Sequence, residues 1–416
     1  MHIVIIGAGL SGVTAAWYLA REGYRITVVE RASAPAQETS FANGGQISIS
    51  HPEPWSNPGA PMQIVRWLGR KDAPLLFRWP AEPARIFWGM AFLRECLPSR
   101  THRNTVSIAR LAAYSGEALK ALRAETGIEY EQRSRGVLHL YFTPEALRHG
   151  EQQCRVLHEL GIAARMLSAE EVLAQEPSLS AVSPKLLGGM LGEQDESGDA
   201  ERFTAALAQR CRDLGVEFRF DTEVEAIEHA NGEVTGLKLK TEASCLQADA
   251  YVLAAGSYST PLARPLGERL PIYPVKGYSA TFALKDIERA PQISLTDESR
   301  RIVCSRLGDR LRIAGTAELN GYKLDLDTER CAGLTRWAEE FFPGVCDTTE
   351  PNYWTGLRPT TPSNLPIIGR ARIGRLYYNT GHGTLGWTLA CGSARALAAI
   401  VASREPEVTY PFTQGQ

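Results

Sequence analysis

The first twelve residues restrict the fold of this chain more than any other segment. An apolar run over residues 2–6 leads directly into the motif Gly7-Ala8-Gly9-Leu10-Ser11-Gly12. This order predicts a strand, a tight turn and a helix: Gly7 permits the turn, Gly9 lets the backbone approach a pyrophosphate, and Gly12 lets the helix pack closely on the strand. Because the unpaired N–H groups at a helix N-terminus bind phosphate, the segment predicts a dinucleotide-binding site.

Glu30 supports this prediction. It stands at the end of the next apolar run, residues 24–29, where its carboxylate can accept hydrogen bonds from ribose hydroxyls. We assign Glu30 and the adjacent Arg31 to the cofactor-binding residues. The motif alone does not distinguish NAD from FAD. It also does not show that the protein is an enzyme, since a glycine-rich segment can be an ordinary turn.

Size and charge limit the classes of partner. At 416 residues the chain is long enough for two domains or for one large domain with insertions. Lys and Arg total 45 against 47 Asp and Glu, so no overall field attracts nucleic acid or an anionic membrane. We therefore expect a small-molecule partner and no nucleic acid.

The cysteines and the apolar runs indicate a cytoplasmic protein. Eight cysteines occur without a C-x-x-C pair and the eight histidines show no metal-ligand spacing, so we predict neither a metal site nor a disulfide framework. The first residues form the nucleotide-binding strand, which leaves no room for a cleavable signal. No apolar run approaches the ~18 residues needed to span a bilayer, so any membrane contact is expected to be peripheral.

Apolar periodicity outlines the remaining elements. Helices are predicted over residues 104–125, 145–176, 203–214, 334–342 and about 384–403. Strands are predicted over residues 215–220, 234–239, 250–256, 278–282 and 310–314. The strand that ends at Gly256 is typical of one returning to a parallel sheet, whereas the strands between 266 and 349 are typical of an antiparallel sheet that carries the substrate.

Residues 62–100 are rich in aromatic side chains, namely Trp67, Phe77, Trp79, Phe87, Trp88 and Phe92. Within this region an apolar stripe recurs at helical spacing: Ile86, Met90, Leu93 and Leu97. We favour the interpretation that the stripe packs in the core, as most amphipathic helix faces do. The alternative is a membrane-facing stripe, because interfacial helices pair aromatic residues with arginines such as Arg85 and Arg94.

A second glycine-rich helix start lies nearly 380 residues after the first. It reads Gly381-His382-Gly383-Thr384-Leu385-Gly386-Trp387-Thr388 and precedes an apolar helix. One dinucleotide needs only one pyrophosphate loop, but a second helix N-terminus aimed at a flavin ring can stabilise the negative charge of reduced flavin. The alternative is a close-packed helix start without a ligand. On this alternative His382 is an ordinary turn histidine.

Two further segments have residue types suited to a cofactor and a carboxylate. The polar segment 38–48 contains Ser40, Asn43, Gly44, Gly45 and Gln46. It can lie along a cofactor and donate backbone N–H groups, or it can be a surface loop. Arg358 stands between Leu357 and Pro359, where proline favours an extended backbone. Its guanidinium can hold a substrate carboxylate at two points or can pair with a structural acid.

Together these residues resemble the D-amino-acid oxidase superfamily of flavoproteins, and more closely the bacterial D-amino-acid dehydrogenases. The resemblance covers nearly the whole chain. Its motifs are the opening glycine motif with Glu30, Thr39-Ser40-x-Ala42-Asn43-x-Gly45-Gln46-Ile47-Ser48, Pro54-Trp55-x-x-Pro58-Gly59, Tyr273-Pro274-x-Lys276-Gly277-Tyr278-Ser279, Trp354-Thr355-Gly356-Leu357-Arg358-Pro359 and Asn379-Thr380-Gly381-His382-Gly383-Thr384-Leu385-Gly386-Trp387-Thr388.

The resemblance implies an α/β fold in which an FAD-binding, Rossmann-like domain of the glutathione-reductase type is interleaved with an α+β substrate domain containing a mostly antiparallel sheet. We expect residues 1–60, 195–265 and 350–416 in the FAD domain, and residues 61–194 and 266–349 in the substrate domain. The cofactor implied is non-covalent FAD. No cysteine stands at the flavin-facing turn, because Cys391 falls within the helix.

The resemblance also implies roles for particular residues. Arg358 holds the substrate carboxylate, the backbone of Val224 meets the adenine, and the turn from Gly383 to Gly386 meets the flavin ring. We add Tyr278 and His382 to the catalytic residues and Gly256 to the cofactor-binding residues. Many superfamily members place a tyrosine or histidine over the substrate, but the matching segment 300–305 offers neither.

The implied reaction is the oxidative deamination of D-amino acids to 2-oxo acids and ammonia, with a hydride passing from Cα to flavin N5. Electrons then go to a quinone or another acceptor, which gives the stripe in 62–100 a membrane role at the inner face of the cell membrane. Other candidates are a D-hydroxyproline dehydrogenase or a glycine or sarcosine oxidase. An NAD-dependent dehydrogenase and a non-catalytic FAD-binding protein represent different classes.

Overall fold

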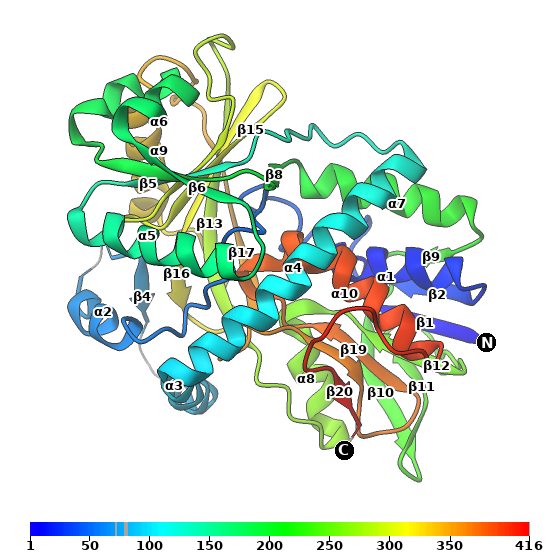
Figure 1. Cartoon of the computed structure of the whole chain (residues 1–416). Helices are drawn as coiled ribbons and strands as arrows, with labels where there is room; N and C mark the ends of the chain where they lie inside the picture. The colour runs from blue at the N-terminus through cyan, green and yellow to red at the C-terminus, as the bar shows by residue number, and fades with distance from the viewer. Residues whose placement is uncertain (71–72, 79–81, 416) are drawn as a thin grey trace.

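Two sheets lying side by side organise the chain (Figure 1). The computed structural model describes residues 1–70, 73–78 and 82–415, so Trp79 of the aromatic region lies outside the described residues. Both termini lie at the end of the molecule that contains the first sheet (Figure 1). The chain passes between the two sheets several times, which is the interleaved α/β arrangement expected from the resemblance.

The first sheet contains the N-terminal strand at its centre. Strands β12, β1, β2 and β9 run parallel, and β19 continues them in parallel next to β12. The order across the sheet is β20 (Thr413–Gln414), β18 (Ile367–Arg370), β19 (Leu376–Thr380), β12 (Ala250–Leu253), β1 (His2–Ile6), β2 (Arg25–Val29) and β9 (Glu217–Arg219). The predicted strands at 2–6, 24–29, 215–220 and 250–256 therefore meet in one sheet.

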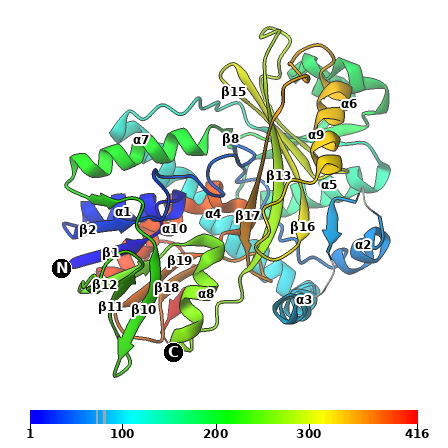
Figure 2. The ribbon, with the colours of Figure 1, turned by 180° about the vertical axis from the view of Figure 1, so that it is seen from behind.

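Alternation along β1 explains how the first sheet is covered on both faces. Ile3 and Ile5 point into a core shared with the helices α1 (Leu10–Arg21), α4 (Pro98–Thr126), α7 (Ala200–Asp213) and α10 (Gly386–Val401). Val4 and Ile6 point into a separate core beneath the hairpin of β10 (Val224–Ala230) and β11 (Glu233–Leu239). Figure 2 shows this hairpin and α8 (Ser259–Ala263) from behind. Strands covered on both faces read as continuous apolar runs, as β1 does.

The second sheet is mixed and mostly antiparallel. Its order is β17 (Asn352–Thr360), β13 (Tyr273–Ala283), β16 (Arg310–Leu319), β15 (Ile302–Leu307), β14 (Ser294–Asp297), β5 (Val137–Tyr141), β7 (Gly188–Gly192) and β6 (Ala164–Ser168), with β4 (Leu75–Phe77) paired to β16. Only the β14–β5 and β16–β4 pairs are parallel. The helix α9 (Thr328–Phe341) packs on β13 and β16 through a core that includes Trp337.

One predicted helix is wrong. The segment predicted as a single helix over 145–176 contains α5 (Pro144–Glu159), the strand β6 and α6 (Ala169–Gln175). The first of these helices ends just before Gly161, which has a φ of 73°, a backbone conformation that glycine adopts without strain. The capping box of Ser168 and Glu171 then starts α6. Apolar spacing alone did not reveal these two boundaries.

Two elements lie away from the domain in which the sequence placed them. The strand β17, assigned to the FAD domain by the boundary at 350, pairs with β13 in the second sheet. The helix α4, assigned to the substrate domain, packs on α10 beside the first sheet, where Gly392 lies so close to Ser115 that a Cβ would come within 2.8 Å of it. Apolar side chains from Ile108 to Leu122 fill this contact.

The apolar stripe in 62–100 is exposed, so the prediction that it packs in the core is wrong. In α3 (Pro83–Glu95) the buried side is formed by Arg85, Phe92 and the partly buried Trp88. Phe92 and Trp88 pack in a cluster with Ala60 of α2 (Ala60–Trp67), whereas Arg85 donates to the carbonyl oxygen of Leu319. The stripe lies on the opposite side and is 52–55% exposed: Ile86, Met90, Leu93 and Leu97. The helical spacing of Ile86, Met90 and Leu93 predicted a single apolar face, but α3 has apolar side chains on two faces.

One helix passes a length and hydropathy test for a membrane span, contrary to the expectation that no apolar run approaches that length. The segment Gly383–Val401 has 19 residues with a mean hydropathy of 1.3. Inside the molecule 72% of this window is buried between α1 and α4. A helix that is apolar all round is typical of a core as well as of a membrane.

Candidate active site

A cavity of about 600 Å³ contacts both sheets and both glycine-rich helix starts. It is lined by residues from the start of the chain, from the loop after β2, from the hairpin β10–β11, from the second sheet and from the start of α10. This volume is typical of a site that encloses a small molecule. Segments separated by nearly 380 residues in the sequence thus face the same space.

The opening motif has the geometry that its glycines predict. Gly7 has a φ of +104°, and a Cβ there would lie 2.8 Å from the carbonyl oxygen of Ala254. A Cβ on Gly12 would lie 1.9 Å from the carbonyl oxygen of Gly7, so α1 can pack this closely only with glycine. Gly9 instead faces the cavity, with Ser40 as its only near neighbour at 3.7 Å. The turn therefore faces the cavity at Gly7 and Gly9, while Gly12 packs behind it.

Glu30 joins this turn to the wall of the cavity. Its carboxylate accepts hydrogen bonds from the backbone N–H groups of Ala8 (2.7 Å) and Ala32 (2.9 Å). Since each carboxylate oxygen can accept more than one hydrogen bond, the group keeps capacity for ribose hydroxyls. Beside it, the guanidinium of Arg31 lies 3.8 Å from the ring centroid of Tyr258 and pairs with Glu38.

The loop from Ser40 to Gln46 is fixed to α1 and to the second sheet. The Ser40 hydroxyl accepts from the N–H of Leu10 (3.1 Å), and Asn43 Oδ1 accepts from the N–H of Gly45 (2.9 Å). The Gln46 amide donates to Ser294 Oγ at 3.0 Å. Gly44 lies against Val303 with no room for a side chain, since a Cβ would come within 2.4 Å. These contacts make the segment an ordered wall of the cavity.

The second glycine-rich turn also faces the cavity. Gly383, Thr384 and Leu385 form a 3₁₀ turn that leads into α10 at Gly386, and all four residues line the cavity. No acidic residue stands in the first turn of α10 to neutralise the positive end of its dipole. The helix start therefore presents positive potential to the cavity.

His382 has a structural position. Its Nε2 lies 3.0 Å from Ser393 Oγ and its Nδ1 lies 3.3 Å from Ser11 Oγ, so the ring joins the starts of α1 and α10. Burial lowers the pKa of His382 to about 4, which keeps the ring neutral at physiological pH. Both nitrogens are engaged by hydroxyls, which leaves neither free for a reacting proton, although His382 had been predicted as a catalytic residue.

Arg358 is a half-buried cation that lines the cavity, and among the described residues no acidic side chain pairs with it. Its guanidinium lies over Gly277, where a Cβ would come within 2.1 Å of Nη1, and it donates to the carbonyl oxygen of Thr316 at 2.9 Å. Within the described residues no ion pair joins Arg358 to a carboxylate. Desolvation lowers its pKa to about 10, so the group stays protonated at neutral pH. An anion in the cavity would compensate this charge.

Tyr278, the third predicted catalytic residue, lines the cavity with its ring but not with an available hydroxyl. The hydroxyl donates to Glu318 Oε2 at 2.7 Å. Burial and this hydrogen bond raise the pKa of Tyr278. Glu318 in turn contacts Lys276, Arg78 and Arg330, so the Tyr278 hydroxyl belongs to a buried ionic cluster rather than to the cavity.

The structure brings nearly all of the predicted cofactor residues to one cavity. Gly7, Gly9, Leu10, Ser11, Glu30, Arg31, Ser40, Asn43, Gly44, Gly45, Gln46, Val224, Gly256, Gly383, Thr384, Leu385 and Gly386 line it. Ala8 and Gly12 stand behind the wall, with Ala8 bonded to Glu30 and Gly12 packed under Gly7. No single residue in the sequence predicted this convergence, which depends on the order of strands in the two sheets.

Sequence reasoning missed several polar residues of the cavity wall. These are His51, Glu53, Glu298, Arg301 and Asn364. They come from a loop, a strand end and a turn, and they follow no motif or periodicity that would mark them. From the segment 300–305, in which no tyrosine or histidine was found, Arg301 and Val303 face the cavity.

The cavity fits non-covalent FAD. The glycine turn provides a cradle that a Cβ would close, Glu30 stands at the strand end beside it, and the α10 start faces the same space from a distant part of the chain. All eight cysteines are free thiols, and Cys391 is buried within α10. The residues present can therefore hold an extended dinucleotide without a cysteinyl link.

Comparisons with known proteins agree with this geometry. The family model described as "DAO: FAD dependent oxidoreductase" matches residues 2–400. The chain is 48% identical over 415 residues to a D-amino acid dehydrogenase of Dechloromonas aromatica, covering 99% of each chain. It is 45% identical to a D-amino acid dehydrogenase of Phenylobacterium zucineum, covering 98% of this chain and 95% of the relative.

Solved structures show the same fold at lower identity. Glycine oxidase from Geobacillus kaustophilus matches with a TM-score of 0.75 at 21% identity, over 98% of this chain and 96% of that one. L-proline dehydrogenase from P. horikoshii matches with a TM-score of 0.75 at 17% identity, over 98% of this chain and 94% of that one. The family model spans most of the chain and the fold agrees throughout. The chain belongs to the DAO family of FAD-dependent oxidoreductases.

Proposed function

We propose that this chain is a D-amino acid dehydrogenase that converts D-amino acids to 2-oxo acids and ammonia. The observation that carries the proposal is Arg358, a half-buried guanidinium without an acidic partner in the described residues, in the same cavity as the FAD-binding turns. Two relatives named D-amino acid dehydrogenase match over at least 95% of each chain and support the substrate class.

In this mechanism Arg358 binds the substrate carboxylate. A guanidinium can donate two parallel hydrogen bonds to a carboxylate, which fixes both its position and its orientation. Thr316 holds the guanidinium from behind, and Gly277 leaves the space for it. With the carboxylate fixed, only rotation about one bond remains to place the Cα hydrogen, and this loss of freedom lowers the barrier.

Bound FAD supplies the two-electron acceptor for this oxidation. The chain contributes the environment of that acceptor: the start of α10 directs N–H groups and a positive dipole end into the cavity. Ser48 N–H donates to Thr388 Oγ1 at 2.9 Å, which ties the loop after Gln46 to the first turns of α10. This hydrogen bond fixes the two walls of the cavity, the loop and the start of α10, relative to each other.

The alternative functions receive less support. A glycine or sarcosine oxidase shares the fold, but the structural match to glycine oxidase is at 21% identity, which shows the fold alone. An NAD-dependent dehydrogenase leaves the second helix start in the cavity unexplained. A non-catalytic FAD-binding protein leaves the unpaired Arg358 unexplained.

An anaerobic amino acid panel tests the proposal. Purified protein with bound FAD is mixed with D- and L-enantiomers of several amino acids, and bleaching of the flavin absorbance is recorded. We expect bleaching by D-amino acids, with product 2-oxo acid detected after hydrolysis. Bleaching by L- but not D-enantiomers would contradict the proposed substrate class.

We also propose that the electrons pass to a quinone at the inner face of the cell membrane. The support is an exposed apolar surface on α2 and α3, formed by Met62, Val65, Leu68, Ile86, Phe87, Met90, Leu93 and Leu97. Phe87 is 68% exposed. Exposed apolar side chains gathered on two short helices favour contact with another apolar phase. Exposed Arg66 and Arg94 on the same helices suit anionic lipid headgroups.

This apolar surface is connected to the cavity wall. Trp88 on α3 donates from Nε1 to the carbonyl oxygen of Thr360, at the end of the strand that carries Arg358 (2.8 Å). Trp55 lines the cavity and packs in the same cluster as Phe92. An acceptor dissolved in the bilayer would therefore meet the molecule near the substrate end of the cavity.

Sedimentation with vesicles tests the surface. We expect the FAD-loaded protein to sediment with vesicles of anionic phospholipid, and the double variant Phe87→Ser, Met90→Ser to remain in solution while D-alanine still bleaches its flavin. Ile287→Ser, a change at an exposed apolar residue in the segment between β13 and β14, is the control. Equal sedimentation of all three proteins would contradict membrane docking by α2 and α3.

A further inference from the structure

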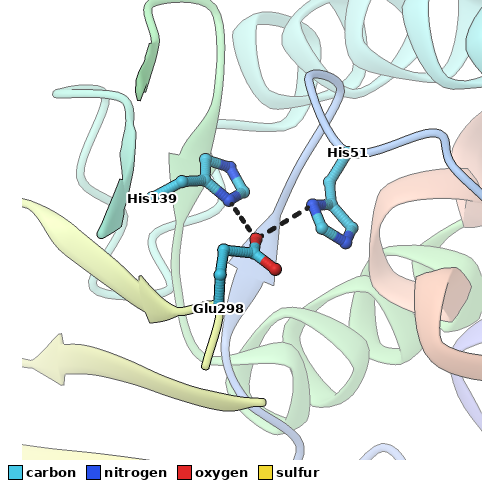
Figure 3. A group of neighbouring side chains, drawn as sticks. All are labelled: His51, His139 and Glu298. Atoms are coloured by element: carbon cyan, nitrogen blue, oxygen red, sulfur yellow. Dashed lines mark hydrogen bonds and ion pairs between the residues drawn. The ribbon is translucent and has the colours of Figure 1, made fainter. Parts of the chain in front are cut away.

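Three side chains far apart in the sequence form a compact polar group beside the cavity: His51, His139 and Glu298 (Figure 3). Glu298 Oε1 lies 2.9 Å from His139 Nδ1 and 3.6 Å from His51 Nδ1. The two imidazole rings stack with a centroid distance of 5.1 Å and planes 4° apart. His51 and Glu298 line the cavity, whereas His139 is buried behind them.

The topology of the second sheet places this group. His139 lies in β5 between Leu138 and Leu140, which point into the apolar core, so the histidine points to the opposite face. The parallel neighbour β14 pairs Thr296 with His139, and Glu298 follows directly after that strand. His51 comes from the loop after β3 (Gln46–Ile47), whose Ser50 is fixed by Asp195 through its backbone N–H at 2.9 Å.

The carboxylate is held as an anion. Arg301 donates to Glu298 Oε2 at 2.7 Å, on the side away from the histidines. Burial raises the pKa of Glu298, but His51, His139 and Arg301 more than offset this effect, so that its pKa lies below the usual range. An ionised Glu298 favours the tautomers in which each Nδ1 carries the proton and each Nε2 carries a lone pair.

His51 is a polar group of the cavity wall with a free proton-accepting atom. In the part of the chain that the structure describes, both nitrogens of His382 are engaged by serines and the Tyr278 hydroxyl is engaged by Glu318. No hydrogen bond to His51 Nε2 occurs among residues 1–70, 73–78 and 82–415. Burial lowers the pKa of His51, which keeps the ring unprotonated at neutral pH.

The oxidation of an amino acid requires such an acceptor. At neutral pH the substrate arrives with an α-ammonium group, and its nitrogen has no lone pair until one proton leaves. Only with that lone pair can a C=N bond form as the Cα hydrogen departs with its electron pair. We propose that His51, oriented by Glu298 and His139, accepts this proton from the substrate ammonium group. The inference rests on the proposed function.

The proton transfer balances without a further reagent. The N–H bond of the ammonium breaks, a bond from that proton to His51 Nε2 forms, and the electron pair stays on the substrate nitrogen. The charge gained by His51 is stabilised by Glu298. The proton then leaves towards solvent past Glu53, which lines the cavity and holds the surface residue His149 at 2.9 Å. Water hydrolyses the resulting imine to the 2-oxo acid and ammonia.

Other charged groups around His51 do not replace it. Arg301 and His139 lower the pKa of His51 by their positive charge, while Glu298 and Glu53 raise it. Tyr141 on β5 and Asp195 face the same group from behind, and burial raises the pKa of each. The three side chains of the group also bring ligand atoms within 4.8 Å, but parallel ring planes do not point two lone pairs at one ion and Arg301 holds the second carboxylate oxygen.

The test measures anaerobic flavin bleaching by D-alanine between pH 6 and pH 10 in FAD-loaded wild type and His51→Gln. We expect the variant to be slower by about 10²–10⁴-fold at pH 7, a range typical of general acid–base groups. The deficit should shrink as the pH rises through the pKa of the substrate ammonium group, because the substrate then arrives as the free amine. A deficit that is constant with pH would overturn the inference.

Glu298→Gln tests the positioning role. Loss of the negative charge lowers the pKa of His51 further, so the acidic limb of the rate profile should move to lower pH, and ¹⁵N resonances of the His51 ring should titrate at the same lower value. If neither the acidic limb of the rate profile nor the titration of the His51 ¹⁵N resonances moves, the role of Glu298 is overturned. His229→Gln, a change at an exposed histidine of β10, is the control and should behave as wild type.

Two further outcomes separate this inference from its alternatives. Absence of bleaching in the wild type with every D-amino acid would contradict the proposed function itself, whereas normal bleaching with a pH-independent His51→Gln deficit contradicts only the proton acceptor. Activity that is lost on treatment with EDTA and restored by Zn²⁺ would assign the group to a metal and overturn the inference.

Discussion

Two cationic sites lie within a few residues of each other on the second sheet, and they differ in one respect. At Glu318, three cations surround one fully buried carboxylate: Arg78 Nε at 2.9 Å, Lys276 Nζ at 3.3 Å and Arg330 Nε at 3.9 Å. At Arg358 a single guanidinium lies beneath the cavity, and no described carboxylate pairs with it. The first site is complete without a ligand and the second is not.

This difference separates structure from function. A buried charge with its partners present holds elements together, here β4, β13, β16 and α9. A buried charge without a partner costs free energy, and the fold retains it at the place where a ligand of opposite charge would compensate it. The neighbouring strands β13 and β17 thus contain one cation site for stability and one for the substrate carboxylate.

Removing the central carboxylate should have the largest effect. Glu318→Gln leaves Lys276 and Arg330 without a carboxylate partner and Arg78 with Asp327 alone, and we expect the free energy of unfolding to fall by about 3–5 kcal/mol. Denaturant unfolding followed by circular dichroism measures this. Glu223→Gln, which breaks an exposed ion pair with Lys240, is the matched control and should leave the midpoint unchanged. Equal midpoints for the two variants would contradict the structural role.

Removing the unpaired cation should act on the substrate instead. For Arg358→Leu we expect the KM for D-alanine to rise by roughly 30- to 3,000-fold, the equivalent of about 2–5 kcal/mol, while FAD stays bound. The free energy of unfolding should not fall, because the variant no longer buries an unpaired charge. Near-normal kinetics of Arg358→Leu, or a loss of stability like that of Glu318→Gln, would contradict the different roles of the Arg358 and Glu318 sites.

Acid should also distinguish the two sites. Burial raises the pKa of Glu318, but the hydrogen bond from Tyr278 and the surrounding cations hold it below the usual range. This carboxyl group therefore contributes stability above its unfolded pKa of ~4.3 that is lost as the pH falls through the lower folded value. Wild-type unfolding free energy should therefore drop below about pH 4, and Glu318→Gln should lose part of that dependence. An identical pH dependence in Arg358→Leu and wild type is expected, since Arg358 does not titrate in this range.

The smallest effect is expected at Tyr278, which touches both the cavity and the Glu318 cluster. Tyr278→Phe removes one hydrogen bond to a charged group, which is worth about 1.5–3 kcal/mol of stability. Since the hydroxyl does not face the cavity freely, the rate of flavin bleaching by D-alanine should remain close to that of wild type. A large loss of rate at unchanged stability would return Tyr278 to the catalytic residues.

The sequence predicted the parts of the site that local geometry enforces. A glycine that must adopt a φ of +104°, or whose Cβ would lie 1.9 Å from a carbonyl oxygen, leaves a signal in the sequence, and so does an arginine before a proline. His51, His139 and Glu298 gave no such signal, because a single histidine or glutamate on a strand or loop has many uses. The pairing of β5 with β14 is needed to bring His139 and Glu298 together.

The apolar stripe of α3 was misjudged for a related reason. Spacing shows that Ile86, Met90 and Leu93 share a face, but it does not show what covers that face. Trp88 and Phe92 form a second apolar side, and the packing against Ala60 decides which of the two is buried. Likewise Tyr278 and His382 carry reactive groups in the sequence, yet their neighbours Glu318, Ser11 and Ser393 engage those groups.

The binding of a simple carboxylate tests the central claim most directly. FAD-loaded wild type and Arg358→Leu are titrated with acetate or benzoate, which have a carboxylate but no amine to oxidise, and the perturbation of the flavin spectrum is recorded. We predict saturable binding to the wild type and binding to Arg358→Leu that is weaker by at least about 30-fold, with equal flavin content in both proteins. Equal affinities would show that Arg358 is not the carboxylate receptor and would contradict the account.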